Sequence, residues 1–264
     1  MQVSMIMDKI IKYPRTPHLA GSRLQAGDED LSQIAFSSLT GQVIAVEEKI
    51  DGANSAISFS GGELRLQSRG HYLTGGHRER HYEPLKIWAA ANRSMLYDLL
   101  GNRYRMYGEW MYAKHKIYYD NLPHYFIEFD ILDKESGKFL DTPSRGALLS
   151  GSGIVSVPLL YRGSYTSEKK ILGLISCSAY ITEGHRENLR LTAESLGLDS
   201  LEILSETDSS GLAEGLYIKV EEDGYVRERM KYVRHGFVQG RVSDTPWHSR
   251  PIIPNMLARG VSLY

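Results

Sequence analysis

The stretch Val46-Glu47-Glu48-Lys49-Ile50-Asp51-Gly52 decides how the chain is interpreted. Apolar residues 43–46 lead into it and an alternating run, residues 55–59, leaves it, so both flanks favour strands. We expect Lys49 to lie at a sheet edge, with Gly52 giving clearance for a ligand. The pattern Lys-x-Asp-Gly arises by chance in about one chain in twenty of this length. The alternative is therefore an ordinary strand-end ion pair of Lys49 with Asp51.

Composition limits the classes of protein that fit. The chain has 264 residues and 42% hydrophobic residues, enough for one large domain or two small ones. Its formal net charge is −1, so any nucleic-acid site must be local. Cys177 is the only cysteine, which excludes an intrachain disulfide and a thiolate zinc site. With no signal-peptide pattern and no apolar run of about 20 residues, we expect a soluble, cytoplasmic protein without a membrane partner.

Periodicity and turn residues predict the elements. We expect a hairpin over residues 55–68, a helix at 84–100, strands at 103–110 and 125–132, helices at 167–180 and 185–197, and strands at 216–220 and 225–233. This irregular order favours an α+β fold of antiparallel sheets flanked by helices.

The two ends of the chain have little periodicity. Residues 1–40 contain Pro14, Pro17 and Gly21, which favour an arm that follows the surface. Residues 236–264 are too few for an independent core, which requires about 40 residues. We expect residues 1–235 to form one domain and residues 236–264, with Trp247, His248 and Arg250, to pack on it as a tail.

Four further patterns suit a nucleoside triphosphate beside Lys49. Glu109 follows a glycine on a strand and could accept hydrogen bonds from a ribose. Residues 126–130 supply an aromatic face for a base, followed by a carboxylate. Glu214 could hold a magnesium ion. Arg229 and Lys231 project from one strand face toward a polyphosphate. Each alone could be an ordinary strand residue, but their joint occurrence favours a nucleotide site.

Taken together, these motifs resemble those of the covalent nucleotidyltransferase superfamily, which contains ATP-dependent RNA ligases, DNA ligases and capping enzymes. Motifs I, Ia, III, IIIa, IV and V correspond to Lys49-Ile50-Asp51-Gly52, Ser68-Arg69-Gly70, Tyr107-Gly108-Glu109-Trp110, Phe126 to Asp130, Glu214 to Lys219 and Arg229-Met230-Lys231. The resemblance covers residues 43–235, and residues 108–116 are similar to the RNA ligase branch in particular. It implies an adenylation domain without a following oligonucleotide-binding (OB) domain.

The resemblance also implies residue roles and partners. Lys49 would form lysyl-AMP from ATP, aided by Asp51 and Lys231, and AMP would pass to an RNA 5′-phosphate that is then sealed to a 3′-hydroxyl. Nucleotide contacts would come from Glu48, Asn54, Arg69, Glu109, Phe129, Lys219 and Arg229. Glu214 and Asp130 would bind Mg²⁺ or Mn²⁺, and Arg78, Arg80, Lys114 and Lys116 are candidate RNA contacts. A separate end-healing kinase or phosphatase is a further candidate partner.

A free lysine has a pKa near 10.4, so only about one in 2,500 is neutral at pH 7. We expect burial, Arg229, Lys231 and a bound cation to lower the pKa of Lys49. Asp51 would raise it, so Asp51 is expected to orient Lys49 or to bind a water of the metal.

Rival interpretations remain. A DNA ligase or a GTP-using capping enzyme shares the lysine motif, but each normally carries an OB barrel after motif V, and the tail is too short for one. A binding protein that has lost catalysis would not need Lys49, Glu109, Glu214 and Lys231 together.

Overall fold

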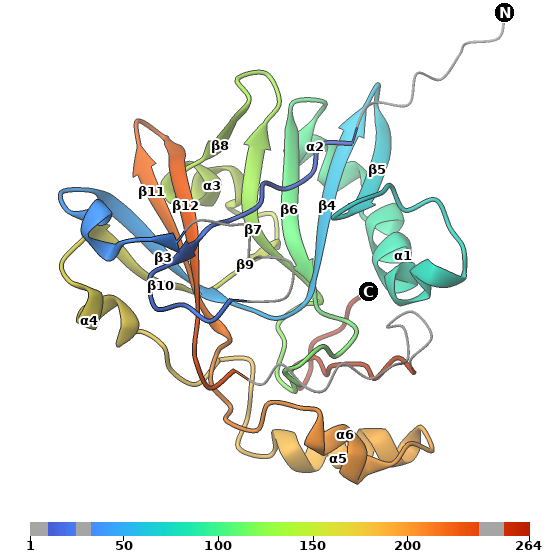
Figure 1. The fold of residues 1–264 in the computed structure, drawn as a ribbon. Helices are drawn as coiled ribbons and strands as arrows, with labels where there is room; N and C mark the ends of the chain where they lie inside the picture. The colour runs from blue at the N-terminus through green and yellow to red at the C-terminus, as the bar shows by residue number, and fades with distance from the viewer. Residues whose placement is uncertain (1–9, 25–32, 238–250) are drawn as a thin grey trace, which may run out of the picture.

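The computed structural model describes residues 10–24, 33–237 and 251–264. Its centre is a strongly curved sheet whose strands follow the order β10-β3-β11-β12-β8-β7-β6-β4-β5 (Figure 1). All neighbours on this path are antiparallel. The strands are β3 (Val43–Lys49), β4 (Ala53–Ser60), β5 (Glu63–Ser68), β6 (Tyr104–Trp110), β7 (Phe126–Asp133), β8 (Lys138–Leu140), β10 (Leu159–Ser164), β11 (Gly215–Glu222) and β12 (Tyr225–Val233). Three short strands pair in parallel beside the path: β1 (His18–Leu19), β2 (Gln33–Ile34) and β9 (Val155–Ser156).

The helices lie around this sheet, as the α+β prediction requires (Figure 1). They are α1 (Glu83–Ala91), α2 (Arg93–Leu100), α3 (Thr142–Leu149), α4 (Glu168–Leu172), α5 (His185–Ser195) and α6 (Ser200–Ser205), with 3-10 turns η1 (Phe36–Leu39) and η2 (His77–Tyr82). The first two cover one side of the sheet through Leu85, Trp88 and Leu96, which share a core with Phe59 of β4. The fold class predicted from sequence is confirmed.

Several predicted boundaries were wrong. The helix expected over residues 84–100 is two helices, because the Asn92 backbone leaves the helical conformation (φ −101°, ψ 19°). The helix expected over residues 167–180 ends at Leu172 before Gly173, and Cys177 instead forms a bridge with Leu212. The predicted hairpin of β4 and β5 is confirmed, as is that of β11 and β12.

The N-terminal arm, residues 10–24, lies across the sheet with exposed and buried residues interspersed. Tyr13, His18 and Leu19 are buried, and His18 pairs in parallel with Lys231 of β12. Figure 1 shows the arm in blue crossing in front of the sheet. Pro14 and Pro17 keep the arm extended. The sheet beneath the arm, and not the two prolines, decides which face of the arm is buried.

The described part of the tail contacts the segment between β6 and β7. Asn255 accepts a hydrogen bond from the Tyr119 amide at 2.9 Å and donates to the Met111 carbonyl at 2.7 Å. Leu257 bridges to Leu122. Trp247, His248 and Arg250 lie outside the described residues, and the domain boundary after residue 235 stays a prediction.

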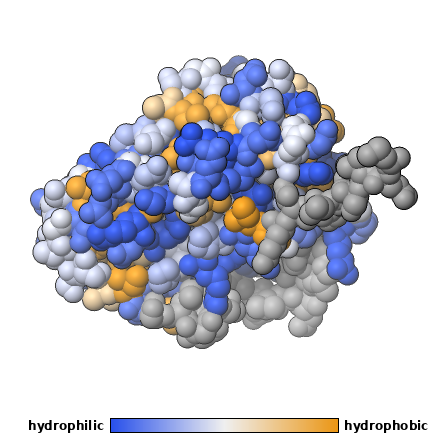
Figure 2. Space-filling model, turned by 90° about the horizontal axis from the view of Figure 1, so that it is seen from above, coloured by the Kyte–Doolittle hydropathy of each residue, from blue (hydrophilic) through white to orange (hydrophobic). Residues whose placement is uncertain are grey.

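Seen from above, hydrophilic side chains cover most of the coloured face and hydrophobic ones form small patches (Figure 2). Such scattered patches are ordinary for a protein surface. Among the described residues, no helix has the length and apolar character that crossing a bilayer requires.

Candidate active site

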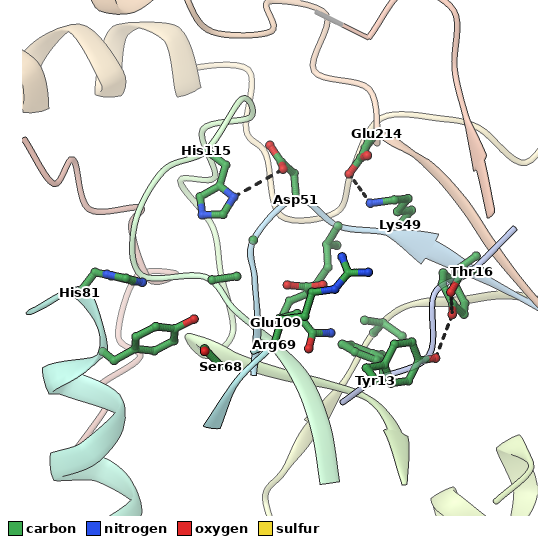
Figure 3. Close-up of a pocket in the computed structure, with 18 of the residues that line it drawn as sticks. Tyr13, Thr16, Lys49, Asp51, Ser68, Arg69, His81, Glu109, His115 and Glu214 are labelled. Atoms are coloured by element: carbon green, nitrogen blue, oxygen red, sulfur yellow. Dashed lines mark hydrogen bonds and ion pairs between the residues drawn. The ribbon is translucent and has the colours of Figure 1, made fainter. Parts of the chain in front are cut away.

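A cavity of about 1000 Å³ opens where β3 ends (Figure 3). This volume is at the upper end of the range for small-molecule sites, about 300–1,000 Å³. Its walls include most of the residues singled out from sequence: Glu48, Lys49, Asp51, Asn54, Arg69, Arg78, Glu109, Phe129, Glu214 and Lys231. The sheet thus brings together residues from all six motifs.

Lys49 is the last residue of β3 and forms an ion pair across the sheet. Its Nζ donates to Glu214 Oε2 at 2.6 Å, because Gly215 of β11 pairs with Lys49 and so places the preceding carboxylate beside the amine. The lysine side chain is 20% exposed and that of Glu214 is 2% exposed. Burial would lower the pKa of Lys49, but the Glu214 carboxylate, together with Glu109 and Asp51, more than offsets it and the pKa is raised. The predicted lowering is therefore wrong for the protein without nucleotide.

Asp51 has a different partner from the one expected. Its Oδ2 accepts hydrogen bonds from the backbone amides of Lys116 at 2.7 Å and Ile117 at 3.0 Å. His115 Nδ1 lies 3.8 Å from Asp51 Oδ1. Asp51 therefore anchors the loop after β6 and does not orient Lys49, because the strand ends at Lys49 and the alternation of side chains ends with it.

Gly52 lines the cavity and is also packed closely against the end of β6. A Cβ at this position would lie 2.5 Å from Met111 Sδ and 3.1 Å from the Trp110 carbonyl oxygen. Because Gly52 has no side chain, the end of β6 can pack directly against its backbone. This close packing sets the distance between the lysine motif and the strand that carries Glu109.

Glu109 and Asn54 pair across β6 and β4 at the cavity wall. Within the described part of the chain, Glu109 Oε2 and Asn54 Oδ1 are buried without a hydrogen-bond partner. Desolvation, the largest cause, raises the pKa of Glu109 to about 8 against the opposing effect of Lys49. Buried acceptors without partners are unfavourable, so this pair is prepared for donors that a ligand would bring.

Aromatic side chains form a further part of the wall. Phe129 of β7 and Tyr217 of β11 both line the cavity, which suits them to contact a base. Glu48 lies nearby with burial raising its pKa, against a hydrogen bond with Ser178 that lowers it.

Lys219 and Arg229 were predicted to bind the nucleotide and Asp130 to bind the metal. All three lie outside the cavity, and the structure does not support these roles. Lys219 is fully buried and contacts Glu47 Oε2 at 2.9 Å, Asp130 Oδ1 at 3.6 Å and the Phe129 carbonyl. Arg229 packs on the Phe139 ring and pairs with Asp130 Oδ2 at 3.4 Å. The alternation of side chains places Lys219 of β11 and Arg229 of β12 on the same face of the sheet. That face packs against β7, so the two cationic side chains pair with carboxylates in the interior.

Of the four residues predicted to contact RNA, one lines the cavity and three do not. Arg78 lines the cavity, whereas Arg80, Lys114 and Lys116 do not. Arg69 and Arg78 are exposed, and both line the cavity. Two cationic groups therefore face the cavity ready for an anion.

Sequence reasoning missed several residues of the wall. Tyr13, Thr16, His71 and His115 line the cavity but come from the arm and from loops, and His77 begins the 3-10 turn η2. Neither spacing nor periodicity marks them, because each reaches the site only through the packing of its segment against the sheet.

The carboxylates suit a divalent cation together with a nucleotide. No group of three or more His, Cys, Asp or Glu side chains gathers as a metal cluster in the described residues. Mg²⁺ binds through one or two carboxylates plus substrate phosphates, so Glu214 at the cavity wall fits this pattern. Asp130 is excluded by its burial under Tyr13 and Arg229.

The raised pKa of Glu109 predicts a pH dependence of folding. A carboxyl group with a folded-state pKa of about 8 keeps its proton where the unfolded chain has released it, above about 4.5. Its contribution to stability is therefore lost as pH rises between these values. In Glu109→Gln we expect the free energy of unfolding to fall less steeply with pH, by up to about 1.4 kcal/mol per pH unit. Urea unfolding at pH 5.5, 7 and 8.5 measures this, with exposed Glu63→Gln as the control; parallel profiles for Glu109→Gln and the unmodified protein would contradict it.

Fold and site together define an α+β protein whose sheet carries a lysine-containing cavity. The model of the RNA ligase family matches residues 42–233. The chain belongs to the RNA ligase family.

Solved structures are similar in fold. A variant of the Naegleria gruberi RNA ligase with ATP and Mn matches with a TM-score of 0.50 and 16% identity, covering 84% of this chain and 60% of that chain. An apo variant of the same ligase matches with a TM-score of 0.49 and 16% identity, covering 75% of this chain and 51% of that chain. The present chain thus spans about half the length of that ligase. No curated protein sequence matches significantly.

Proposed function

We propose that the chain is an ATP-dependent RNA ligase that forms lysyl-AMP on Lys49, transfers AMP to an RNA 5′-phosphate and seals that end to a 3′-hydroxyl. The observation that carries this proposal is the contact of Lys49 with Glu214 at 2.6 Å, in the same cavity as the unpartnered acceptors of Glu109 and Asn54. Family membership supports the RNA substrate, and the ATP and Mn bound to the Naegleria gruberi variant support the nucleotide and the metal.

In the first step, Lys49 Nζ attacks the α-phosphorus of ATP. The Lys49 ammonium first loses a proton to solvent, and the neutral amine forms the nitrogen–phosphorus bond. The bond between the α-phosphorus and the bridging oxygen breaks, pyrophosphate leaves, and the second proton of the nitrogen also passes to solvent. Glu214 and the ATP phosphates would hold Mg²⁺ or Mn²⁺, which supplies positive charge beside the polyphosphate. Once Glu214 is engaged in this way, its ion pair with Lys49 weakens and the pKa of Lys49 falls. Lys231, on the same cavity wall, is suited to the α-phosphate.

The nucleotide and RNA contacts are assigned by position. Glu109 would accept hydrogen bonds from the ribose, and Phe129 would stack on adenine. Arg69 and Arg78 face the cavity and would contact the RNA 5′-phosphate. Arg80, Lys114 and Lys116 would act further along the RNA. A cytoplasmic location and a separate end-healing enzyme are parts of the same proposal.

Labelling with α-phosphate-labelled nucleotide tests the function. With Mg²⁺ or Mn²⁺ and labelled ATP, we expect label to stay on the protein through a denaturing gel, and label from GTP to be much weaker. Nicked duplex RNA, single-stranded RNA and nicked DNA then separate an RNA ligase from a DNA ligase. Absence of label from ATP would reject the proposal, and sealing of DNA alone would reject the RNA substrate.

A further inference from the structure

The N-terminal arm is held at both ends by the sheet. At one end the carbonyl oxygen of Ile11 accepts hydrogen bonds at 3.0 Å from both Gln67 of β5 and Arg105 of β6. At the other end the Lys231 amide of β12 donates to the Pro17 carbonyl at 2.9 Å. The arm therefore connects β12, an inner strand of the sheet, with β6 and the edge strand β5 (Figure 1).

Between these two anchors, the arm inserts Tyr13 against the aromatic residues of the site. The Tyr13 hydroxyl donates to Asp130 Oδ2 at 2.7 Å and lies 2.8 Å from the Tyr217 hydroxyl. Its ring contacts Phe129 edge to face, with centroids 5.0 Å apart and an interplanar angle of 84°. The Thr16 hydroxyl also lies 2.8 Å from that of Tyr217.

The two side chains held in this way are the aromatic residues that strands β7 and β11 present to the cavity, Phe129 and Tyr217. In the described part of the chain, both hydrogen-bond partners of the Tyr217 hydroxyl belong to the arm. A ring fixed before binding loses less conformational freedom when a flat ligand stacks on it, so fixed rings raise affinity.

We propose that the arm is part of the nucleotide site and that Tyr13 is a positioning residue, which holds the rings of Phe129 and Tyr217 for the purine base of ATP. This inference rests on the proposed function for the identity of the nucleotide. Thr16 assists from the same segment by fixing the other side of the Tyr217 hydroxyl.

Single hydroxyl deletions test the inference with little risk to the fold. Tyr13→Phe and Thr16→Val are each expected to raise the KM for ATP in lysyl-AMP formation about five-fold, as the loss of one hydrogen bond predicts. The rate at saturating ATP should stay within about two-fold, since neither side chain touches the reacting atoms. Thr16→Ser keeps the hydroxyl and should restore the KM.

The control is Tyr118→Phe, which removes the hydrogen bond of the buried Tyr118 with Thr192 at 3.0 Å outside the cavity wall. It should leave the KM unchanged. An unchanged KM in both Tyr13→Phe and Thr16→Val, or a fall only in the saturated rate, would overturn the inference.

Equilibrium binding of ATP to Lys49→Ala separates this inference from the proposed function. If the unmodified protein takes no label from ATP, the proposed function fails. A weaker ATP affinity after adding Tyr13→Phe to Lys49→Ala would still support the role of Tyr13, whereas equal affinities would reject it.

Discussion

Lys49→Ala is expected to abolish covalent labelling of the protein by ATP, a loss of at least about a thousand-fold in the rate of lysyl-AMP formation. Lys49→Arg should be as inactive, because a guanidinium keeps the charge and the ion pair with Glu214 but stays protonated. This pair of variants separates a nucleophile from a charge that only binds phosphate. Single-turnover labelling with α-labelled ATP measures both.

The pH dependence of the labelling rate is a second test of Lys49 as the nucleophile. Because Glu214 raises the pKa of Lys49 in the protein without nucleotide, the neutral amine is scarce there at neutral pH. The labelling rate at ATP concentrations well below the KM, which reports the free protein, should therefore rise with pH. Exposed Lys170→Ala is the matched control and should label like the unmodified protein. Strong labelling of Lys49→Ala would show that another residue carries the nucleotide.

Gly215→Ala is expected to destabilise the fold by about 4 kcal/mol or more, or to prevent folding. A Cβ at this position would lie 1.8 Å from the carbonyl oxygen of Tyr232 and 3.0 Å from Val233 Cα. These are backbone atoms of the neighbouring strand, so no side-chain movement can relieve the overlap. β11 would have to move away from β12, and Glu214 would move away from Lys49.

The control for this prediction is Gly146→Ala in helix α3. A Cβ there meets nothing within 4 Å, and alanine favours a helix over glycine by about 0.5–1 kcal/mol. We therefore expect a small gain in the free energy of unfolding, measured in urea at pH 7. A Gly215→Ala protein as stable as Gly146→Ala would contradict the proposed packing of β11 on β12.

Local patterns predicted the hairpins and the fold class well. Residues 60–63 and 222–224 form turns that their glycines favour, and alternating side chains mark the strands on both sides. The short strands β8 and β9 and the helices α3 and α6 were not predicted, because segments this short have too little periodicity to stand out.

The sequence predicted less well which polar residues line the cavity and which pair inside the sheet. Lys49, Glu109, Phe129, Glu214 and Lys231 were predicted as a set and do line one cavity. Alternation could not tell which polar residues face the cavity and which face the next strand, so Lys219, Arg229 and Asp130 were assigned to the ligand although they pair inside the sheet.

The sequence by itself determined the family, the antiparallel sheet and the lysine at the end of a strand, because these depend on residue types at short spacing. Only the tertiary structure decided that Glu214 sets the charge state of Lys49, that Asp51 anchors a loop, and that Tyr13 reaches Phe129. These contacts join residues far apart in the chain, and the physical reason is that strand register and sheet curvature, which no local pattern encodes, set the distances between them.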